Sequence, residues 1–253
     1  MSEPIVSSLA KALRVLECFT VSEPELGVTE ISKKLGIGKS NAHNIISTYC
    51  QMGYLQQLPN RKYTLGYKLL EHAFIINQHL GYPHAVYDLL LEAAERTGQV
   101  VYFGIPYETD VLYLYVAQPI ARMKELPYRE ICGEHAPLCT TGIGKAILAN
   151  LPPEEWLSRL PEIIPAHTPQ TITDKDRILQ ELQSTRERGF AIDNSEHELN
   201  VRCVGVPVYN ARGALVAGIS SSGAVQVMTD RKIMECADIL MGITQRIKER
   251  LYA

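Results

Sequence analysis

VTEISKKLGIGKSNAHNIISTYCQMGYLQQLPNRKYTL, residues 28–65, is the stretch that decides how the first part of this 253-residue chain folds. Apolar residues recur at helical spacing on both sides of Gly36, and short alternating runs follow Gly53. This pattern predicts two helices joined by a turn and then a two-stranded hairpin, or wing. We expect a helix-turn-helix over about residues 28–50 and a wing over residues 54–65.

Local chemistry predicts where both helices begin and end. Thr29 is expected to cap the first helix, because its hydroxyl can accept a hydrogen bond from a free backbone N–H. Gly36 is expected to end that helix, and the second helix should start near Lys39 or Ser40. The inward apolar positions of the second helix are Ala42, Ile45, Ile46 and Tyr49.

The outward face of the second helix is polar and suited to hydrogen bonding. Its expected members are Lys39, Ser40, Asn41, His43, Asn44 and Ser47. Asparagine can pair with adenine through two hydrogen bonds, serine can reach a base or a phosphate, and a lysine near the helix start suits a phosphate. Arg61 and Lys62 are expected at the wing tip, where they could meet a phosphate backbone. The motif therefore predicts DNA binding by these residues.

The distribution of charge favours the same interpretation. Residues 28–70 hold six basic residues and one acidic residue, a net charge of +5, whereas the whole chain carries −3. A basic segment within a slightly acidic chain indicates a local contact with a polyanion. The alternative is that the motif serves only packing or protein binding and that its charges are merely solvated. That alternative predicts no salt-dependent affinity for DNA.

Composition bounds the class of protein. The chain is 46% apolar and 21% charged, which is typical of a soluble globular protein. No apolar run approaches the ~18 residues of a membrane span, and the start, MSEPIVSSLAKALRVL, lacks the features of a signal peptide. We expect a cytoplasmic protein without membrane contact. The six cysteines contain no C-x-x-C pair and the histidines have no ligand spacing, so we expect neither a disulfide framework, a metal site nor a cofactor.

The pattern outside the motif predicts further helices in the first third of the chain. Residues 7–20 should form an amphipathic helix that completes a three-helix core through Leu9, Ala12, Leu13, Leu16 and Phe19. Residues 68–80 should form a helix too apolar to stand alone in water. We expect it to lie between the two domains and to pack against a partner protomer. We predict a DNA-binding domain over residues 1–67, a linker helix over 68–81 and a second domain over 82–253.

The second domain mixes strands and helices without simple βαβ repetition. Helices are expected over residues 83–96, 141–151, 173–188 and 229–251, with a short one after Pro152. Strands are expected over residues 99–105, 111–117, 190–193, 201–209 and 214–222, with a further strand near 128–132. This order predicts an α+β fold, an antiparallel sheet with helices packed on one side.

Two stretches of the second domain are candidates for ligand binding. Small residues with free N–H groups at a helix start suit an anion such as a carboxylate, and these are Thr140, Thr141, Gly142 and Gly144. Polar residues also gather at apolar strand ends, namely Asp193, Cys203, Ser220, Ser221 and Ser222. Strand alternation puts Ser220 and Ser222 on one face and Ser221 on the other. These serines either bind a polar ligand or bond to backbone, and the residues alone leave both interpretations open.

Several motifs in order along the chain resemble the IclR family of bacterial transcriptional regulators. They are ELSxxxG-type spacing at residues 30–36, KS at 39–40, GY at 53–54, YTLG at 63–66, PL..T..GKA at 137–146, RERGFAID at 186–193 and VRCVGVPVYNARGALVAGISSSG at 201–223. The resemblance covers nearly the whole chain. It implies a winged helix-turn-helix domain, a linker helix and a GAF-like effector-binding domain.

The resemblance also implies partners and an effector site. Such regulators bind partly palindromic operator DNA as homodimers or dimers of dimers, and respond to a small organic acid or sugar acid. The family's effector pocket falls on Gly142, Ile143, Asp193, Cys203, Ser220 and Ser222. The loop MKELPYRE adds Leu126 and Tyr128 as apolar candidates. Many members carry Thr and Arg where this chain has Asn41 and Asn44, so the operator sequence does not transfer from a relative.

Such regulators act near operons for using carbon sources and include both repressors and activators, and we expect a repressor of a catabolic operon. The alternative is an enzyme with a GAF-like domain. Cys203 follows Arg202, and a neighbouring cation can lower the pKa of a thiol and make it a nucleophile. No histidine lies at a recognisable spacing from Cys203, and a cysteine in a strand is more often a small core residue. We therefore expect no catalytic residues and no enzymatic activity.

Overall fold

The computed structural model describes residues 4–122 and 131–251. The chain divides into two compact units, Met1–Leu80 and Gly81–Ala253. Among the described residues, no helix is both long and apolar enough to cross a lipid bilayer.

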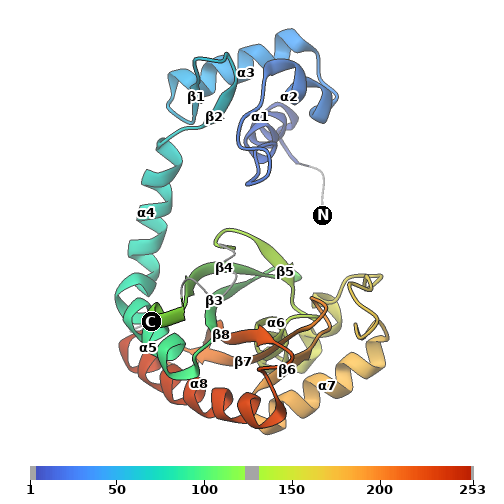
Figure 1. The fold of residues 1–253 in the computed structure, drawn as a ribbon. Coiled ribbons are helices and arrows are strands. Elements are labelled where there is room, and N and C mark those ends of the chain that lie inside the picture. Colours follow the sequence, from blue (N-terminus) through green and yellow to red (C-terminus); the bar gives the residue numbers. More distant parts are fainter. Residues whose placement is uncertain (1–3, 123–130, 252–253) are drawn as a thin grey trace. The chain divides into compact units, whose positions relative to one another are not determined.

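The first unit is a winged helix-turn-helix (Figure 1). Its elements are α1 (Ser7–Glu17), α2 (Val28–Leu35), α3 (Lys39–Gln51), β1 (Leu55–Gln57), β2 (Tyr63–Leu65) and α4 (Lys68–Leu80). The strands of the wing are antiparallel, with Leu55 opposite Leu65 and Gln57 opposite Tyr63. This arrangement confirms the winged fold expected from the sequence.

The core of the first unit forms where the three helices and the wing meet. Its buried residues are Val15, Cys18, Phe19, Leu26, Ile31, Ala42, Ile46, Leu55 and Tyr63. The expected inward stripe of α1 is partly wrong, because Leu9 and Leu13 are 57% and 49% exposed. Val15 fills the core in their place, and is fully buried. The apolar periodicity of α1 therefore describes two faces of the helix, of which only one packs inside this unit.

The start of α2 also differs from expectation. Gly27, and not Thr29, occupies the position before the helix, and its N–H donates to the Glu30 carboxylate over 2.6 Å. A glutamate at the third helical position can reach back in this way and favours the positive end of the helix dipole. Gly36 ends α2 as expected, with a φ of +63° that glycine adopts without strain.

Helix α4 begins directly after the wing and carries a largely apolar, exposed surface. Leu70, Phe74, Ile75 and Ile76 are each about 60% exposed or more. Tyr54, the residue before β1, contacts this helix: its hydroxyl lies 3.0 Å from Nε2 of His72, and its ring stacks on that imidazole. An apolar surface of this kind on a helix indicates a surface for association.

The second unit is built on a six-stranded antiparallel sheet of order β5-β4-β3-β8-β7-β6. The strands are β3 (Val100–Tyr107), β4 (Asp110–Ala117), β5 (His135–Pro137), β6 (Ala191–Asn194), β7 (Val201–Tyr209) and β8 (Leu215–Ala224). The helices are α5 (Tyr82–Thr97), α6 (Gly142–Asn150), α7 (Lys175–Arg188) and α8 (Asp230–Arg250), with 3₁₀ turns at Ile120–Arg122, Pro153–Glu155 and Leu157–Arg159. Figure 1 shows α8 running along the sheet.

Helices cover both faces of this sheet, which corrects the expectation of one covered face. On β7, Gly205 lies against the backbone of Gly142 at the start of α6. Residues two apart on a strand share a face, so Val204, Val206 and Val208 point the other way, and they are fully buried under α8. The fold is therefore three layers, with α5 and α8 on one side and α6 on the other.

Of two further local expectations, one lies largely outside the described residues and one needs correction. The first is the strand expected near residues 128–132; beside β4, at one edge of the sheet, the structure shows β5. Helix α7 is capped by Asp174 and not by Thr173, since the Asp174 carboxylate accepts from the N–H of Arg177 over 2.9 Å. Aspartate is as good a cap as threonine or better, so a pattern that holds both residues does not choose between them.

Candidate nucleic-acid interface and ligand pocket

The outward face of α3 is open along its length in the first unit. Lys39, Ser40, Asn41, His43 and Asn44 are exposed, and Ser47 is half-buried. Ala42 and Ile46 are fully buried on the opposite face and fix the rotation of the helix. Because 3.6 residues complete a turn, this anchoring presents the polar residues together on one side. The α3 residues predicted for DNA contact are therefore accessible, Ser47 less so than the others.

The wing tip places Arg61 and Lys62 in different surroundings. Arg61 is exposed and has a φ of +64°, in a turn closed by the bond from its N–H to the carbonyl of Leu58 over 3.0 Å. Lys62 is half-buried, and its ammonium lies 3.6 Å from the Glu30 carboxylate. The Glu30 carboxylate therefore contacts both the N–H of Gly27, at the start of α2, and the Lys62 ammonium of the wing. Arg61 is the wing cation that projects into solvent.

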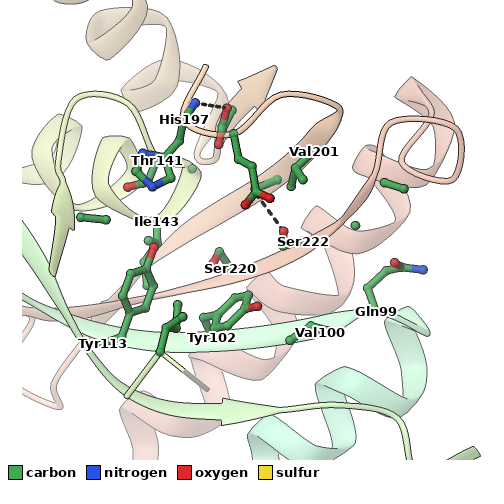
Figure 2. A pocket seen from close by; sticks show the side chains of 18 of the residues that line it. Gln99, Val100, Tyr102, Tyr113, Thr141, Ile143, His197, Val201, Ser220 and Ser222 are labelled. Carbon is green, nitrogen blue, oxygen red and sulfur yellow. Dashed lines mark hydrogen bonds between the residues drawn. The ribbon is translucent and has the colours of Figure 1, made fainter. Parts of the chain in front are cut away.

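In the second unit, a cavity of about 690 Å³ opens on the face of the sheet that carries α6. Its floor consists of two rows of residues that are neighbours across the strands. One row is Asp193, Cys203, Ser222 and Val100, from β6, β7, β8 and β3. The other is Ser220 and Tyr102, from β8 and β3. Figure 2 shows Tyr102, Tyr113, Ser220 and Ser222 gathered around this space.

The start of α6 forms one wall of the pocket. Thr141 caps the helix, because its hydroxyl accepts from the N–H of Gly144 over 3.0 Å. A Cβ on Gly142 would lie 3.1 Å from Cβ of Cys203, so a glycine here lets the first turn sit directly on β7. Gly142 and Ile143 line the pocket, and N–H groups of a first helical turn have no carbonyl partner within the helix. This wall can therefore hold an anion.

Asp193 is the buried acid of the pocket, 2% exposed at the end of β6. Its Oδ1 accepts from the N–H of Glu196 over 2.7 Å and from that of His197 over 3.4 Å. Burial raises the pKa of Asp193 from 3.8 to about 6, while the Glu196 N–H and the Lys145 ammonium act in the opposite direction. The carboxyl group can thus change its charge near neutral pH, and either form can hydrogen-bond to a ligand.

Cys203 lies next to Asp193 on the pocket floor, and its Sγ donates to Ser222 over 3.1 Å. Burial raises the pKa of this thiol well above its usual range, and the charge of Asp193 acts in the same direction. Arg202 projects from β7 the other way and binds the carbonyl of Met228 and the Asp230 carboxylate, both over 2.7 Å. The thiol is therefore kept protonated, which is the opposite of what a nucleophilic cysteine requires.

The structure brings together six of the eight residues that the family resemblance assigns to the effector pocket. Gly142, Ile143, Asp193, Cys203, Ser220 and Ser222 all line the one cavity. Tyr128, like Leu126, lies outside the described residues. Ser221 points to the opposite face, as alternation predicts. Gly144 was also a candidate but does not line the cavity, and its N–H donates to the Thr141 hydroxyl.

Sequence reasoning missed part of the lining. Gln99, Tyr102, Tyr113, His197 and Asn200 also border the cavity. Tyr102 belongs to the row of Ser220, so strand alternation would have found it once the pairing of β3 with β8 was known. His197 and Asn200 lie in the loop after β6, where no periodic pattern marks them.

Comparison with known proteins matches both units to domain families. Residues 80–249 match the bacterial transcriptional regulator IclR C-terminal domain, and residues 8–59 match the IclR helix-turn-helix domain. The chain is 32% identical to the HTH-type transcriptional regulator XynR of Escherichia coli over 232 residues, 91% of each chain. Among further relatives, some are named repressors and one is named an activator.

Solved structures agree with these matches. The IclR crystal structure of Thermotoga maritima has a TM-score of 0.76 at 29% identity, covering 97% of this chain and 99% of that one. An IclR homologue of Microbacterium hydrocarbonoxydans, crystallised in complex with 4-hydroxybenzoate, has a TM-score of 0.84 at 21% identity, with coverage of 97% and 99%. The latter similarity concerns the fold alone.

Proposed function

This chain belongs to the IclR family of bacterial transcriptional regulators, and we propose that it represses a catabolic operon under the control of a small organic acid or sugar acid. The observation that carries the proposal is the convergence of six predicted residues on one cavity of about 690 Å³ in the second unit. A cavity of this size suits a small organic ligand. The relatives with known names are regulators and not enzymes.

We place the acid group of the effector at the start of α6. There the N–H groups of Gly142 and Ile143 and the helix dipole favour a negative charge. Ser220, Ser222 and Asp193 then face the remainder of the ligand, where hydroxyl groups can both donate and accept hydrogen bonds. The rings of Tyr102 and Tyr113 supply apolar contact.

DNA binding is proposed for the first unit. Asn41 and Asn44 would read base edges in the major groove, while Lys39 and Arg61 would contact phosphates. Ser40, His43 and Ser47 add hydrogen-bonding capacity on the same face of α3, and Lys62 adds charge to the wing. Operator DNA lies in the bacterial cytoplasm, so we propose that the protein is cytoplasmic.

We propose that the protein acts as a homodimer or a dimer of dimers. The exposed apolar residues of α1 and α4 are unusual for the surface of a monomer, and a second copy of the chain would cover them. Paired recognition helices would then read a partly palindromic operator. The effector shifts DNA affinity only if it prefers one arrangement of the paired units.

The test is binding of the purified protein to the DNA upstream of its own gene, across a salt series and with a panel of acids. Pyruvate, D-gluconate and 4-hydroxybenzoate represent keto, sugar and aromatic acids. We expect tight binding that weakens steeply with salt and that one class of acid relieves. Binding strengthened by the acid would indicate activation, and absence of DNA binding at low salt would refute the regulatory function.

A further inference from the structure

Lys145 and Glu196 form a buried ion pair beside the pocket. Nζ of Lys145 lies 2.5 Å from Oε1 of Glu196, and their side chains are 1% and 7% exposed. Neither belongs to the described residues that line the cavity. The effector site as proposed above therefore makes no direct use of this pair.

Stability alone is a weak reason for such a pair. Removing two charges from water costs free energy that their attraction barely repays, and apolar residues of similar size are often at least as stable. The second carboxylate oxygen of Glu196, Oε2, is buried without a hydrogen-bond partner among the described residues, which adds to the cost. A role in positioning neighbouring residues, or in setting their charge, would explain why Lys145 and Glu196 are ionic.

The position of the pair suggests that role. Lys145 is the fourth residue of α6, two positions after Ile143. Glu196 lies in the loop after β6, and its backbone N–H holds Oδ1 of Asp193 over 2.7 Å. The ion pair thus ties together the two elements that form the polar end of the pocket.

A second set of bonds holds the same loop from the other side. Thr168 donates its hydroxyl to the carbonyl of Ser195, and Thr171 donates to that of Glu196, each over 2.6 Å. Further along the loop, Nδ1 of His197 lies 3.2 Å from the hydroxyl of Thr140, the residue before the α6 cap. The loop is therefore fixed at the residues that orient Asp193.

We propose that Lys145 and Glu196 are a positioning pair, which holds the start of α6 against the loop after β6 and so sets Asp193 for the effector. The inference rests on the proposed function of the pocket. It assigns neither residue to ligand contact. Both act through Asp193 and through the backbone N–H groups of Gly142 and Ile143.

The charges of the pair have opposite effects on Asp193. The groups that face it are Lys145 from α6, Glu196 and His197 from the loop, Cys203 from β7 and Tyr113 from β4. Burial raises the pKa of Asp193, the Lys145 ammonium lowers it and the Glu196 carboxylate raises it, with the ammonium having the larger effect of the two. If the pair only held the two elements together, removing either charge would not shift the pKa of Asp193 in opposite directions.

The first test is the titration of Asp193 in the full-length protein, followed by the ¹³C resonance of its carboxyl group. Lys145→Met should raise the titration midpoint, Glu196→Gln should lower it, and the double variant should lie between the two and above the unaltered protein. Lys232→Met, which breaks an ion pair with Glu235 on α8, is the control and should leave the midpoint unchanged.

A purely structural role of the pair predicts different titration midpoints for Asp193. If the pair only stabilises the loop, every variant admits water to Asp193, and all midpoints fall toward the ordinary value of a carboxyl group. That result would overturn the inference. If one single variant does not fold, the double variant decides alone, because it leaves neither charge buried without its partner and its midpoint should rise.

The second test uses acetate as a small carboxylate probe, followed through the amide resonances of Gly142 and Ile143. Lys145→Met should weaken acetate binding roughly tenfold, about the worth of one hydrogen bond to a charged group. Unchanged affinity would contradict the positioning role. If acetate leaves these amides unperturbed in the unaltered protein, the proposed anion site fails, and the Asp193 titration still decides the inference.

Discussion

Asn41 on α3 and Arg61 on the wing are expected to contact different parts of the DNA, bases and phosphates respectively. Asn41→Ala should weaken operator binding by about 1–3 kcal/mol and relax one base position, because asparagine can read a base edge. Arg61→Ala should weaken binding to every sequence and lower the salt slope by about one. Competition titrations on operator and random DNA measure both. Equal losses of Asn41→Ala on the two DNAs would exclude base reading by that residue.

The raised pKa of Asp193 predicts how the stability of the effector-free protein depends on pH. Burial raises its pKa from 3.8 to about 6 in the folded chain. A carboxyl group with a raised pKa contributes stability that is fully present below pH 3.8 and is lost as the pH rises through about 6. Asp193→Asn should therefore stabilise the protein by roughly 1–3 kcal/mol at about pH 8 and change little at about pH 4.

Chemical denaturation of both proteins at the two pH values measures this difference. Asp238→Asn, at an exposed position on α8, is the matched control and should stay within about 0.5 kcal/mol of the unaltered protein. Destabilisation by Asp193→Asn at high pH would mean that the ionised carboxylate is favourable where it is buried.

The sequence predicted residues on the pocket floor best where they lie on long strands. Cys203, Ser220 and Ser222 follow from alternation along long apolar strands, and Gly142 from a helix start. Tyr102 and Tyr113 were missed because their place depends on how β3 and β4 pair with distant strands. Lys145 was hidden within a helix pattern, since no local rule predicts a buried lysine whose partner is 51 residues away.

At the scale of elements, contact between α6 and β7 shapes the anion wall. A Cβ on Gly205 would overlap the backbone of Gly142, so Gly205→Ala should force the two elements apart and cost about 2–3 kcal/mol. Gly242→Ala is the matched control, because nothing lies near its Cβ within α8 and alanine favours a helix. Thermal unfolding should shift down for the first variant and slightly up for the second. A neutral Gly205→Ala would show that the contact is looser than described.

Element types followed from the sequence more reliably than their ends and faces. Long periodic helices and β-branched strands lie where expected, while the caps of α2 and α7 were each misplaced, because several nearby residues can cap. The faces of α1 were misread for a different reason. Leu9 and Leu13 repeat at helical spacing but stay exposed, and periodicity does not reveal whether an apolar face meets its own chain or another.

At the scale of the whole molecule, self-association should depend on α4. Phe74→Asp places a charge on its exposed apolar surface, where Phe74 is 63% exposed, so it should yield monomers with weaker operator binding. Ile163→Asp, at an exposed position of the second unit, should leave the assembly unchanged. Analytical ultracentrifugation separates the two outcomes. An unaltered assembly in Phe74→Asp would move the interface away from α4.

The central claim is that a ligand in the second unit controls DNA binding by the first. The most direct measurement is fluorescence anisotropy of labelled upstream DNA, titrated with protein with and without the responding acid. The unaltered protein and the double variant Ser220→Ala with Ser222→Ala are compared. We predict that the acid releases DNA from the unaltered protein, whereas the variant still binds DNA and no longer responds. An equal response of the two proteins would contradict control through this pocket.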